Sequence, residues 1–182
     1  MKFKTNSHIL KSGSQINIRV PQIEDAQDLL DLKRAYIKNT STLPLTLEEY
    51  PIDVKKEANL IEDYYKSENS ILLVAEFNNI LIGNIDLTGS QRSKMFHTGM
   101  LGMGIGEKWR NQGLGKLLIE SVIDWAKHNS KIEIVWLDVY TSNELGYNLY
   151  KKTGFKKCGI IKNFFKQDQQ YIDKIQMYQR IK

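Results

Sequence analysis

The chain is poor in the residues that bridge it covalently or ligate metals. Its 182 residues include one cysteine, Cys158. A single cysteine excludes an intrachain disulfide and is typical of a reducing compartment, so we expect a cytoplasmic protein. Three histidines, His8, His97 and His128, lie far apart in the sequence. With one cysteine they form no metal-ligand spacing, and we therefore expect no metal site.

Long hydrophobic runs are also missing. The longest, ILLVA at 71–75, is far too short to cross a bilayer. The opening MKFKTNSHIL lacks the apolar segment of a signal peptide, and we expect no membrane partner. Hydrophobic residues at 41% and charged residues at 26% are close to globular averages, which predicts a folded core. The net charge of +5 suits an anionic partner, but it is scattered along the chain.

Hydrophobic periodicity predicts a mixed sheet with helices on its faces. Alternating or continuous apolar runs predict strands at 15–20, 70–77, 80–87, 97–106, 131–140, 155–165 and 171–180. Helical spacing and terminal residues predict helices at 24–38, 54–66, 114–128 and 142–154. This order of about seven strands and about four helices defines an α/β (α+β) fold. We expect a single domain over 1–182, with residues 1–13 as an N-terminal extension outside the core.

Glycines are concentrated in one strand–turn–helix unit. Gly102, Gly104 and Gly106 alternate in the strand, which strips one face of side chains and indicates a bulge or a close backbone approach. The plain alternative is a helix packed flush against the strand. Gly113 and Gly115 stand at the start of the next helix. There, unpaired N–H groups and the helix dipole favour the binding of an anion. The alternative is an ordinary glycine turn that binds nothing.

Two familiar phosphate motifs do not fit these glycines. A Walker A loop requires Ser or Thr after Gly115-Lys116, where this chain has Leu117. A dinucleotide-binding G-x-G-x-x-G requires glycine at Leu118. The anion is therefore expected to be neither a P-loop nucleotide nor NAD.

The segment Arg110-Asn111-Gln112-Gly113-Leu114-Gly115 resembles the [QR]-x-x-G-x-[GA] signature of GCN5-related N-acetyltransferases, the GNAT superfamily. Its place between a glycine-rich strand and an amphipathic helix strengthens the resemblance. SNELGYNLYKKTGF at 142–155 is similar to another family segment, and YIDKIQMY at 171–178 resembles the close of the ribosomal-protein and spermidine acetyltransferase branch. The resemblance covers 16–182 and implies a GNAT-like, largely antiparallel sheet.

The resemblance also implies a cofactor and the residues that bind it. The co-substrate is acetyl-CoA, whose pyrophosphate the loop amides hold and whose pantetheine arm Asn143 contacts. The implied acetyl-CoA residues are Met103, Gly104, Ile105, Arg110, Asn111, Gln112, Gly113, Leu114, Gly115, Lys116 and Asn143. The implied catalytic acid is Tyr150, which protonates the departing thiolate. Helical spacing places Asn143, Tyr147 and Tyr150 on one face, a pattern that also occurs on ordinary half-buried helices.

The general base is less evident from the sequence. Only a neutral amine attacks a thioester, so a group must accept the proton of an alkylammonium. Met100 stands where relatives often carry glutamate, and this departs from the family pattern. Asp138 is the candidate catalytic base by its place in LDVY; the alternative is an ion-paired strand carboxylate. Glu48 and Glu49 are candidates for amine recognition or ordinary surface charges.

These observations predict an acetyl-CoA-dependent N-acetyltransferase that transfers the acetyl group to a primary amine by direct attack. The alternative is a non-catalytic acyl-CoA sensor on the same fold. A third hypothesis, a nucleic-acid binder, rests on the lysines of 151–166, which edge strands also carry as protection against edge pairing. The acceptor stays open between a small amine, a polyamine and a protein N-terminus. The oligomeric state is open too, although homodimers are common in the family.

Overall fold

A computed structural model describes residues 3–50 and 52–182. One sheet of eight strands runs in the order β1-β2-β3-β4-β5-β6-β8-β7. The strands are β1 (Asn6–Ile9), β2 (Gln15–Arg19), β3 (Ile71–Phe77), β4 (Ile80–Gly89), β5 (Thr98–Ile105), β6 (Ile134–Tyr140), β7 (Lys156–Gln167) and β8 (Gln170–Arg180). The helices are α1 (Ala26–Lys38), α2 (Val54–Lys66), α3 (Leu114–His128) and α4 (Glu144–Lys152). The predicted fold class is confirmed.

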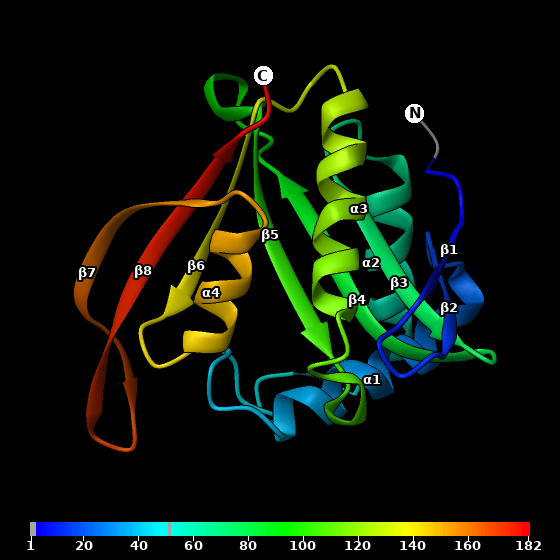
Figure 1. Cartoon of the computed structure of the whole chain (residues 1–182), viewed down its shortest axis with the longest axis horizontal. Helices are drawn as coiled ribbons and strands as arrows, with labels where there is room; N and C mark the ends of the chain where they lie inside the picture. Colours follow the sequence, from blue (N-terminus) through cyan, green and yellow to red (C-terminus); the bar gives the residue numbers. More distant parts are fainter. Residues whose placement is uncertain (1–2, 51) are drawn as a thin grey trace.

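Helices cover both faces of the sheet (Figure 1). On one face, α3 and α4 pack over a core that includes Leu87, Leu118 and Val135. On the other face, α1 and α2 cover a smaller cluster around Leu29 and Val74. The larger core is apolar throughout, whereas the second face carries several polar groups beside its apolar cluster.

The first strand was not predicted. Residues 6–9 read NSHI, a short polar run without alternation, and their side chains are mostly exposed. They form β1 only through antiparallel pairing with β2, in which Asn6 lies opposite Ile18. Leu10 follows and is 3% exposed in the main core. The expectation that residues 1–13 lie outside the core is therefore wrong for this part, because tertiary pairing supplies an order that the local sequence does not signal.

The central strands β5 and β6 pair over only a short stretch before they diverge. They are the one parallel neighbour pair of the described sheet, and their register spans only Thr98↔Ile134 to Met100↔Trp136. Beyond Met100 the strands diverge, as Figure 1 shows. The remaining half of β5 pairs with β4 alone, from Gly83↔Ile105 to Leu87↔Leu101. One backbone edge of β5 therefore has no strand partner along residues 101–105.

The hairpin of β7 and β8 forms the other end of the sheet. β7 is an edge strand, and most of its side chains are exposed, including its lysines. Its anchor is Phe165, whose ring stacks on Tyr140 with centroids 3.7 Å apart. The edge position supports the reading of these lysines as protection against strand pairing.

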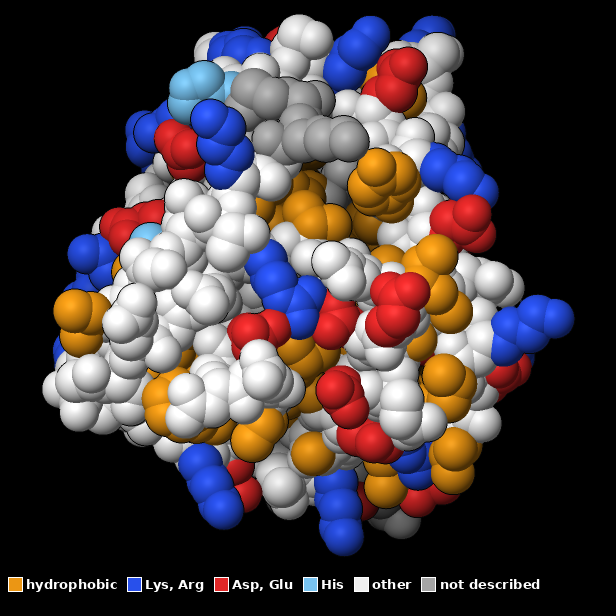
Figure 2. All heavy atoms as spheres, turned by 90° about the vertical axis from the view of Figure 1, so that its right-hand side faces the viewer, with side chains coloured by type: hydrophobic (Ala, Val, Ile, Leu, Met, Phe, Trp, Pro, Cys, Tyr) orange, Lys and Arg blue, Asp and Glu red, His pale blue; other side chains and the backbone are white. Residues whose placement is uncertain are grey.

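Charge of both signs is interspersed on the surface, as Figure 2 shows for the face that carries β1 and β2. Among the described residues, no helix is both long and apolar enough to cross a membrane.

Arg19 joins three elements near one edge of the sheet. From β2, its guanidinium donates two hydrogen bonds to Asp25, at 2.6 and 2.9 Å, just before α1. It also donates to Glu76 of β3 at 2.7 Å. Burial alone would raise the pKa of Asp25, but the hydrogen bonds from Arg19 and from the Gln22 N–H hold that pKa below its ordinary value.

Arg19→Met should lower the free energy of unfolding at pH 7 by about 1–3 kcal/mol, because it leaves two carboxylates without their donor. A depressed folded-state pKa contributes stability above the ordinary pKa near 3.8 and loses it as the pH falls through the folded value. The difference between variant and wild type should therefore shrink towards pH 3. Urea denaturation at pH 7 and pH 3 measures it, and an equal difference at both pH values would contradict the assignment.

Candidate active site

The loop before α3 presents a row of free backbone donors. It follows a short 3₁₀ turn, Glu107–Trp109, and turns through Asn111 at φ 62° and Gly113 at φ 91°. Both values lie in the left-handed region that glycine and asparagine tolerate. Among the described residues, the N–H groups of 111–115 donate to no protein acceptor, and the first bonds of the helix run from Lys116 and Leu117 to the Gly113 carbonyl. Adjacent free N–H groups at a helix N-terminus form an anion site.

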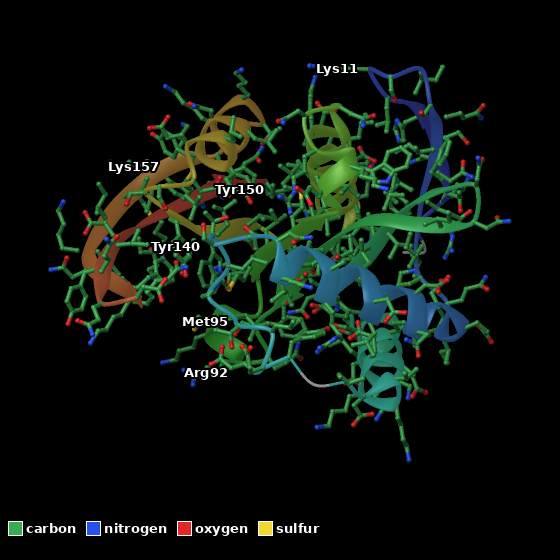
Figure 3. All side chains as sticks on the ribbon, turned by 90° about the horizontal axis from the view of Figure 1, so that it is seen from below. Lys11, Arg92, Met95, Tyr140, Tyr150 and Lys157 are labelled. Carbon is green, nitrogen blue, oxygen red and sulfur yellow. The ribbon has the colours of Figure 1, made fainter. Side chains whose placement is uncertain are left out.

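The space above Gly113 is open. A Cβ there would meet a single atom within 4 Å, Cγ of Lys11, at 3.9 Å. Lys11 lies beside the start of α3 (Figure 3), and its backbone N–H donates to the Gln112 carbonyl at 3.1 Å. The N-terminal segment thus brings an exposed ammonium to the loop. Sequence reasoning missed Lys11 because about 100 residues separate it from the motif and only the β1–β2 turn joins them.

Two other glycines allow close packing rather than ligand access. A Cβ at Gly115 would lie 2.9 Å from a methyl group of Leu149 in α4 and 3.3 Å from Ile105 in β5. Gly115 therefore lets α3, α4 and β5 meet closely. On the opposite face of β5, the ring of Tyr36 lies directly against Gly104. At Gly104, therefore, the missing side chain lets α1 pack closely against β5.

The side chains of the loop mostly support its shape. Arg110 donates from Nε to the Ile105 carbonyl at 3.2 Å and from a terminal nitrogen to the Asn39 carbonyl at 3.4 Å. Gln112 donates to the Lys108 carbonyl at 2.8 Å. Leu114 is buried, and Lys116 is exposed beside Glu120. The loop therefore offers backbone groups to an anion, while Arg110 and Gln112 hold it in place.

Asn143 caps α4 rather than lying within it. Its Oδ1 accepts the Gly146 N–H at 2.9 Å, and its Nδ2 donates to the Thr42 hydroxyl at 3.4 Å. The Asn143 side chain also occupies the room beside Gly146. Asn143 thus joins α4 to the irregular segment after α1 and stands at the side of the β5–β6 divergence.

Tyr150 points from α4 over the sheet (Figure 3). Its ring meets Phe155 edge-on, with centroids 6.0 Å apart. Among the described residues, its hydroxyl has no hydrogen-bond partner. Burial raises the pKa of Tyr150 to about 12, so the hydroxyl stays protonated at neutral pH. It is a proton donor without a committed acceptor.

Asp138 is an ion-paired carboxylate. Its Oδ2 accepts from Lys174 at 2.8 Å, and its Oδ1 accepts from Gln176 at 3.4 Å. The Lys174 ammonium also lies 3.8 Å from the ring centroid of Phe164. The structure thus shows the ion pair that the sequence left as the alternative reading. Met100 lies on β5 and is 40% exposed. As a methionine, it supplies no carboxylate at the position where relatives often carry glutamate.

Glu48 and Glu49 belong to the exposed part of the irregular segment, and Glu49 accepts the Thr46 N–H at 2.8 Å in a local turn. A different set of polar residues lies under α1 and α2. Lys33 and Glu57 form a buried ion pair at 2.6 Å, and Asp86 of β4 lies within hydrogen-bond distance of two hydroxyl groups. Lys33 on the buried face of α1 is a local signal for this cluster, but its partners come from other helices and strands and show no such pattern.

The chain matches the sequence profile described as "Acetyltransferase (GNAT) family" over residues 35–155. With the fold, the anion loop and the diverging strands, this match shows that the chain belongs to the GNAT family of acetyl-CoA-dependent N-acetyltransferases. The resemblance seen in the sequence is confirmed.

Curated relatives are distant. The chain is 25% identical over 101 residues to L-amino acid N-acetyltransferase AaaT of Escherichia coli, a match that covers 56% of this chain and 62% of that relative. It is 24% identical to an N-alpha-acetyltransferase of Sulfurisphaera tokodaii, over 85% of this chain and 89% of the relative. It is also 24% identical to the [ribosomal protein uS5]-alanine N-acetyltransferase of E. coli, over 69% of this chain and 66% of that relative. The last relative belongs to the branch that the chain ending resembles.

Solved structures agree on the fold. An acetyltransferase of the GNAT family from Streptococcus pneumoniae superposes with a TM-score of 0.88 at 28% identity, covering 92% of this chain and 99% of that one. A phosphinothricin acetyltransferase from Sinorhizobium meliloti, solved with acetyl-CoA, has a TM-score of 0.80 at 14% identity, covering 91% and 88%.

Gly113→Ala should weaken acetyl-CoA binding at least about tenfold, because the new methyl group enters the open space above the free amides. The substitution also strains the backbone at φ 91°, and Gly154→Ala, at φ 98° beyond α4, imposes a comparable strain away from the loop. Titration calorimetry should show near-normal affinity for Gly154→Ala. Equal affinity for both variants would remove the loop as the anion site.

Proposed function

We propose that the protein transfers the acetyl group of acetyl-CoA directly to a primary amine. The observation that carries this proposal is the run of five free N–H groups, 111–115, at the start of α3, next to the point where β5 and β6 diverge. Such a row suits the pyrophosphate of CoA, with Lys11 as an additional cation at its side. Cys158 is an exposed free thiol that forms no disulfide, and this agrees with the proposed cytoplasmic location, as does the use of acetyl-CoA.

The unpaired edge of β5 supplies the next part of the site. Residues 101–105 pair with β4 on one side only, so donors on their other edge face the divergence. We propose that the backbone N–H groups of Met103 and Ile105, which point away from β4 on either side of Gly104, stabilise the thioester oxygen as it gains charge during attack. A fixed donor at an oxyanion is commonly worth about 100-fold to 1000-fold in kcat.

Tyr150 is the proposed general acid. The collapse of the tetrahedral intermediate breaks the C–S bond and produces a thiolate, and Tyr150 donates its proton to that sulfur. The ordinary thiol pKa is about 8.5, below the raised pKa of Tyr150, but partial removal from water also raises the pKa of the thiol and so narrows the difference between the two pKa values. The ion pair with Lys174 favours a structural role for Asp138 over that of a base.

The proposed acceptor is an α-amino group. The names of the relatives specify an L-amino acid, an N-alpha position and an alanine of a ribosomal protein. Alanine has no amine other than its α-amino group. A chain-terminal α-amino group has a pKa near 7.7–8.0, so a much larger share is neutral at pH 7 than for an alkyl amine near 10.4.

A panel of amines tests this function. The purified chain with acetyl-CoA should release free thiol when an L-amino acid or an alanine-initiated peptide is added, and release less with spermidine. A peptide with a blocked N-terminus is the control. Tight acetyl-CoA binding without amine-dependent release from any amine would support the sensor alternative and reject the enzyme.

Tyr150→Phe should lower kcat by about 10-fold to 1000-fold, because the thiolate then leaves without its proton donor. The ring contact with Phe155 is retained, so acetyl-CoA affinity and thermal stability should change little. Tyr147→Phe, one turn away on α4, is the matched control and should keep kcat near the wild-type value. A wild-type kcat for Tyr150→Phe would exclude Tyr150 as the acid.

A further inference from the structure

Asp86 lies on β4 directly across from Gly102 of β5. It belongs to the sheet face that α1 and α2 cover. Gly102 falls within the stretch of β5 that has lost its pairing with β6, and it precedes Met103. The carboxylate is therefore one strand away from the edge at which the acetyl group is proposed to react.

The two oxygens of Asp86 have different surroundings. Oδ2 lies 3.2 Å from the hydroxyl oxygens of both Tyr64 and Thr88, and since one hydroxyl donates to the other at 2.5 Å, Oδ2 accepts from the second of the two. Oδ1 accepts no hydrogen bond from the described residues, and it is not sealed from solvent. The hydroxyls thus fix the orientation of the carboxylate and leave one oxygen uncommitted.

Gly102 determines where that oxygen lies. A Cβ built on Gly102 would come within 2.9 Å of Oδ1 and 3.2 Å of Oδ2. Both oxygens therefore rest over the bare backbone of β5, and any side chain at 102 would displace them. The glycine that looked like a weak point in the strand leaves room for the carboxylate.

Other carboxylates near the site are already committed. Glu57 accepts from Lys33 through Oε1 at 2.6 Å and from Tyr50 through Oε2 at 2.7 Å. Asp138 is paired through both oxygens. A carboxylate whose lone pairs are taken by cationic or hydroxyl donors accepts a further proton poorly. Of Glu57, Asp138 and Asp86, only Asp86 keeps a free oxygen.

We propose that Asp86 is the catalytic residue that accepts a proton from the ammonium group of the acceptor, in place of the glutamate that Met100 replaces. This assignment rests on the proposed function. The N–H bond of the ammonium breaks and an O–H bond forms at Oδ1. The neutral amine then attacks the thioester carbon, and the C–S bond breaks. After the attack the nitrogen loses a second proton, which restores the Tyr150 hydroxyl after Tyr150 has protonated the sulfur, so the products are the amide, the thiol and one proton on Asp86.

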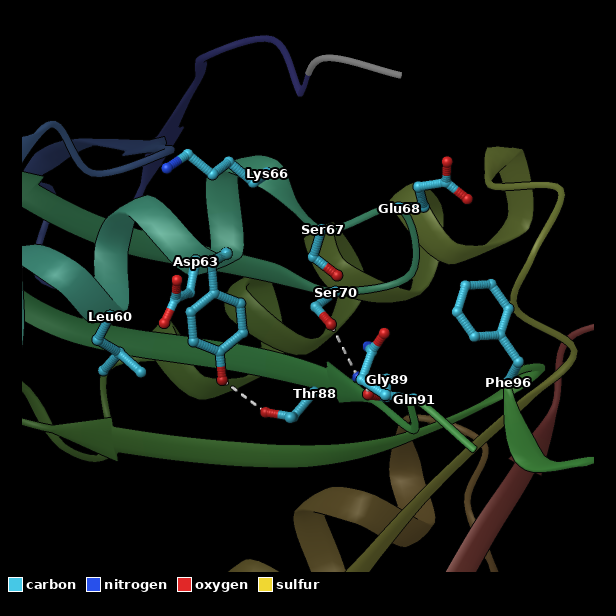
Figure 4. Close-up of a pocket in the computed structure, with 11 residues that line it drawn as sticks. Leu60, Asp63, Lys66, Ser67, Glu68, Ser70, Thr88, Gly89, Gln91 and Phe96 are labelled. Carbon is cyan, nitrogen blue, oxygen red and sulfur yellow. Dashed lines mark hydrogen bonds between the residues drawn. The ribbon is translucent and has the colours of Figure 1, made fainter. Parts of the chain in front are cut away.

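That proton has a route to water. Tyr64 and Thr88 hydrogen-bond to each other at 2.5 Å and line an open groove between α2 and the end of β4 (Figure 4). Other walls of this groove are formed by Leu60, Gly89 and Phe96. Solvent also reaches Oδ1, so the proton that this oxygen takes up can pass to water after each turnover.

The groups around Asp86 also set its basicity. Lys33 and Tyr36 face it from α1, Tyr64 from α2, and Thr88 from its own strand, while Glu57 of α2 is near the two tyrosines. Burial raises the pKa of Asp86 above its ordinary value, while Lys33 and the two hydroxyls oppose that rise. A carboxylate with a raised pKa is a stronger base near neutral pH. Since the active form is the anion, kcat/KM should rise with pH through this pKa.

Asp86→Asn tests the assignment with an isosteric side chain. At pH 7, kcat/KM should fall about 100-fold, and the loss should shrink above about pH 9, where the acceptor α-amine is neutral without help. Acetyl-CoA affinity by calorimetry should not change. Asp138→Asn is the matched control and should keep the wild-type pH profile. Wild-type kcat/KM at pH 7 in Asp86→Asn, or loss of the acidic limb in Asp138→Asn instead, overturns the proposal.

Tyr64→Phe provides a second test that leaves the carboxylate in place. Because the Tyr64 hydroxyl lowers the pKa of Asp86, its removal should move the acidic limb of the kcat/KM profile to higher pH, with acetyl-CoA affinity retained. An unmoved limb would contradict the role of Asp86 even if Asp86→Asn failed to fold. Absence of thiol release from wild type with every amine rejects the enzyme and this assignment together, whereas an active wild type with an indifferent Asp86→Asn rejects only the latter.

Discussion

The short parallel register of β5 and β6 is the constraint on which the site depends. Pairing ends at Met100↔Trp136, and from there the backbone of β5 has a partner on one side only. Peptide groups on an unpaired edge retain hydrogen-bonding capacity, which a continuous sheet would have consumed. The anion loop at the start of α3 and the hydroxyl of Tyr150 on α4 are placed around this divergence by the α3–β6–α4 connection. An uninterrupted β5–β6 ladder would leave no room for a thioester between the strands.

The glycines of this region have distinct physical roles. Gly113 adopts a left-handed conformation and leaves open space above free amides, which suits a ligand. Gly115 and Gly104 instead permit close approach of Leu149 and Tyr36, so they bring elements together. Gly102 makes room for the carboxylate of Asp86. The same residue type thus provides ligand access, close packing and room for a carboxylate between residues 102 and 115.

The two faces of the sheet differ in polarity. The face under α3 and α4 is an apolar core, against which the partly buried ring of Tyr150 packs. The face under α1 and α2 holds the Lys33–Glu57 pair and Asp86 among tyrosine hydroxyls. The first face suits the protonation of a leaving group in a dry environment. The second suits the capture and deprotonation of a cationic amine, and its groove gives it contact with water.

The sequence by itself determined the order of the elements from residue 15 onward, the helix at 54–66 and the family, because local periodicity and motif residues encode them. It also indicated the anion loop, whose free amides depend only on a local motif and the helix that follows. Tertiary structure decided what depends on distant segments. β1 forms only by pairing, Lys11 reaches the loop through the β1–β2 turn, Asp138 is committed to Lys174, and Asp86 owes its free oxygen to Gly102. Contacts between residues far apart along the chain leave no local pattern, so only the folded chain reveals them.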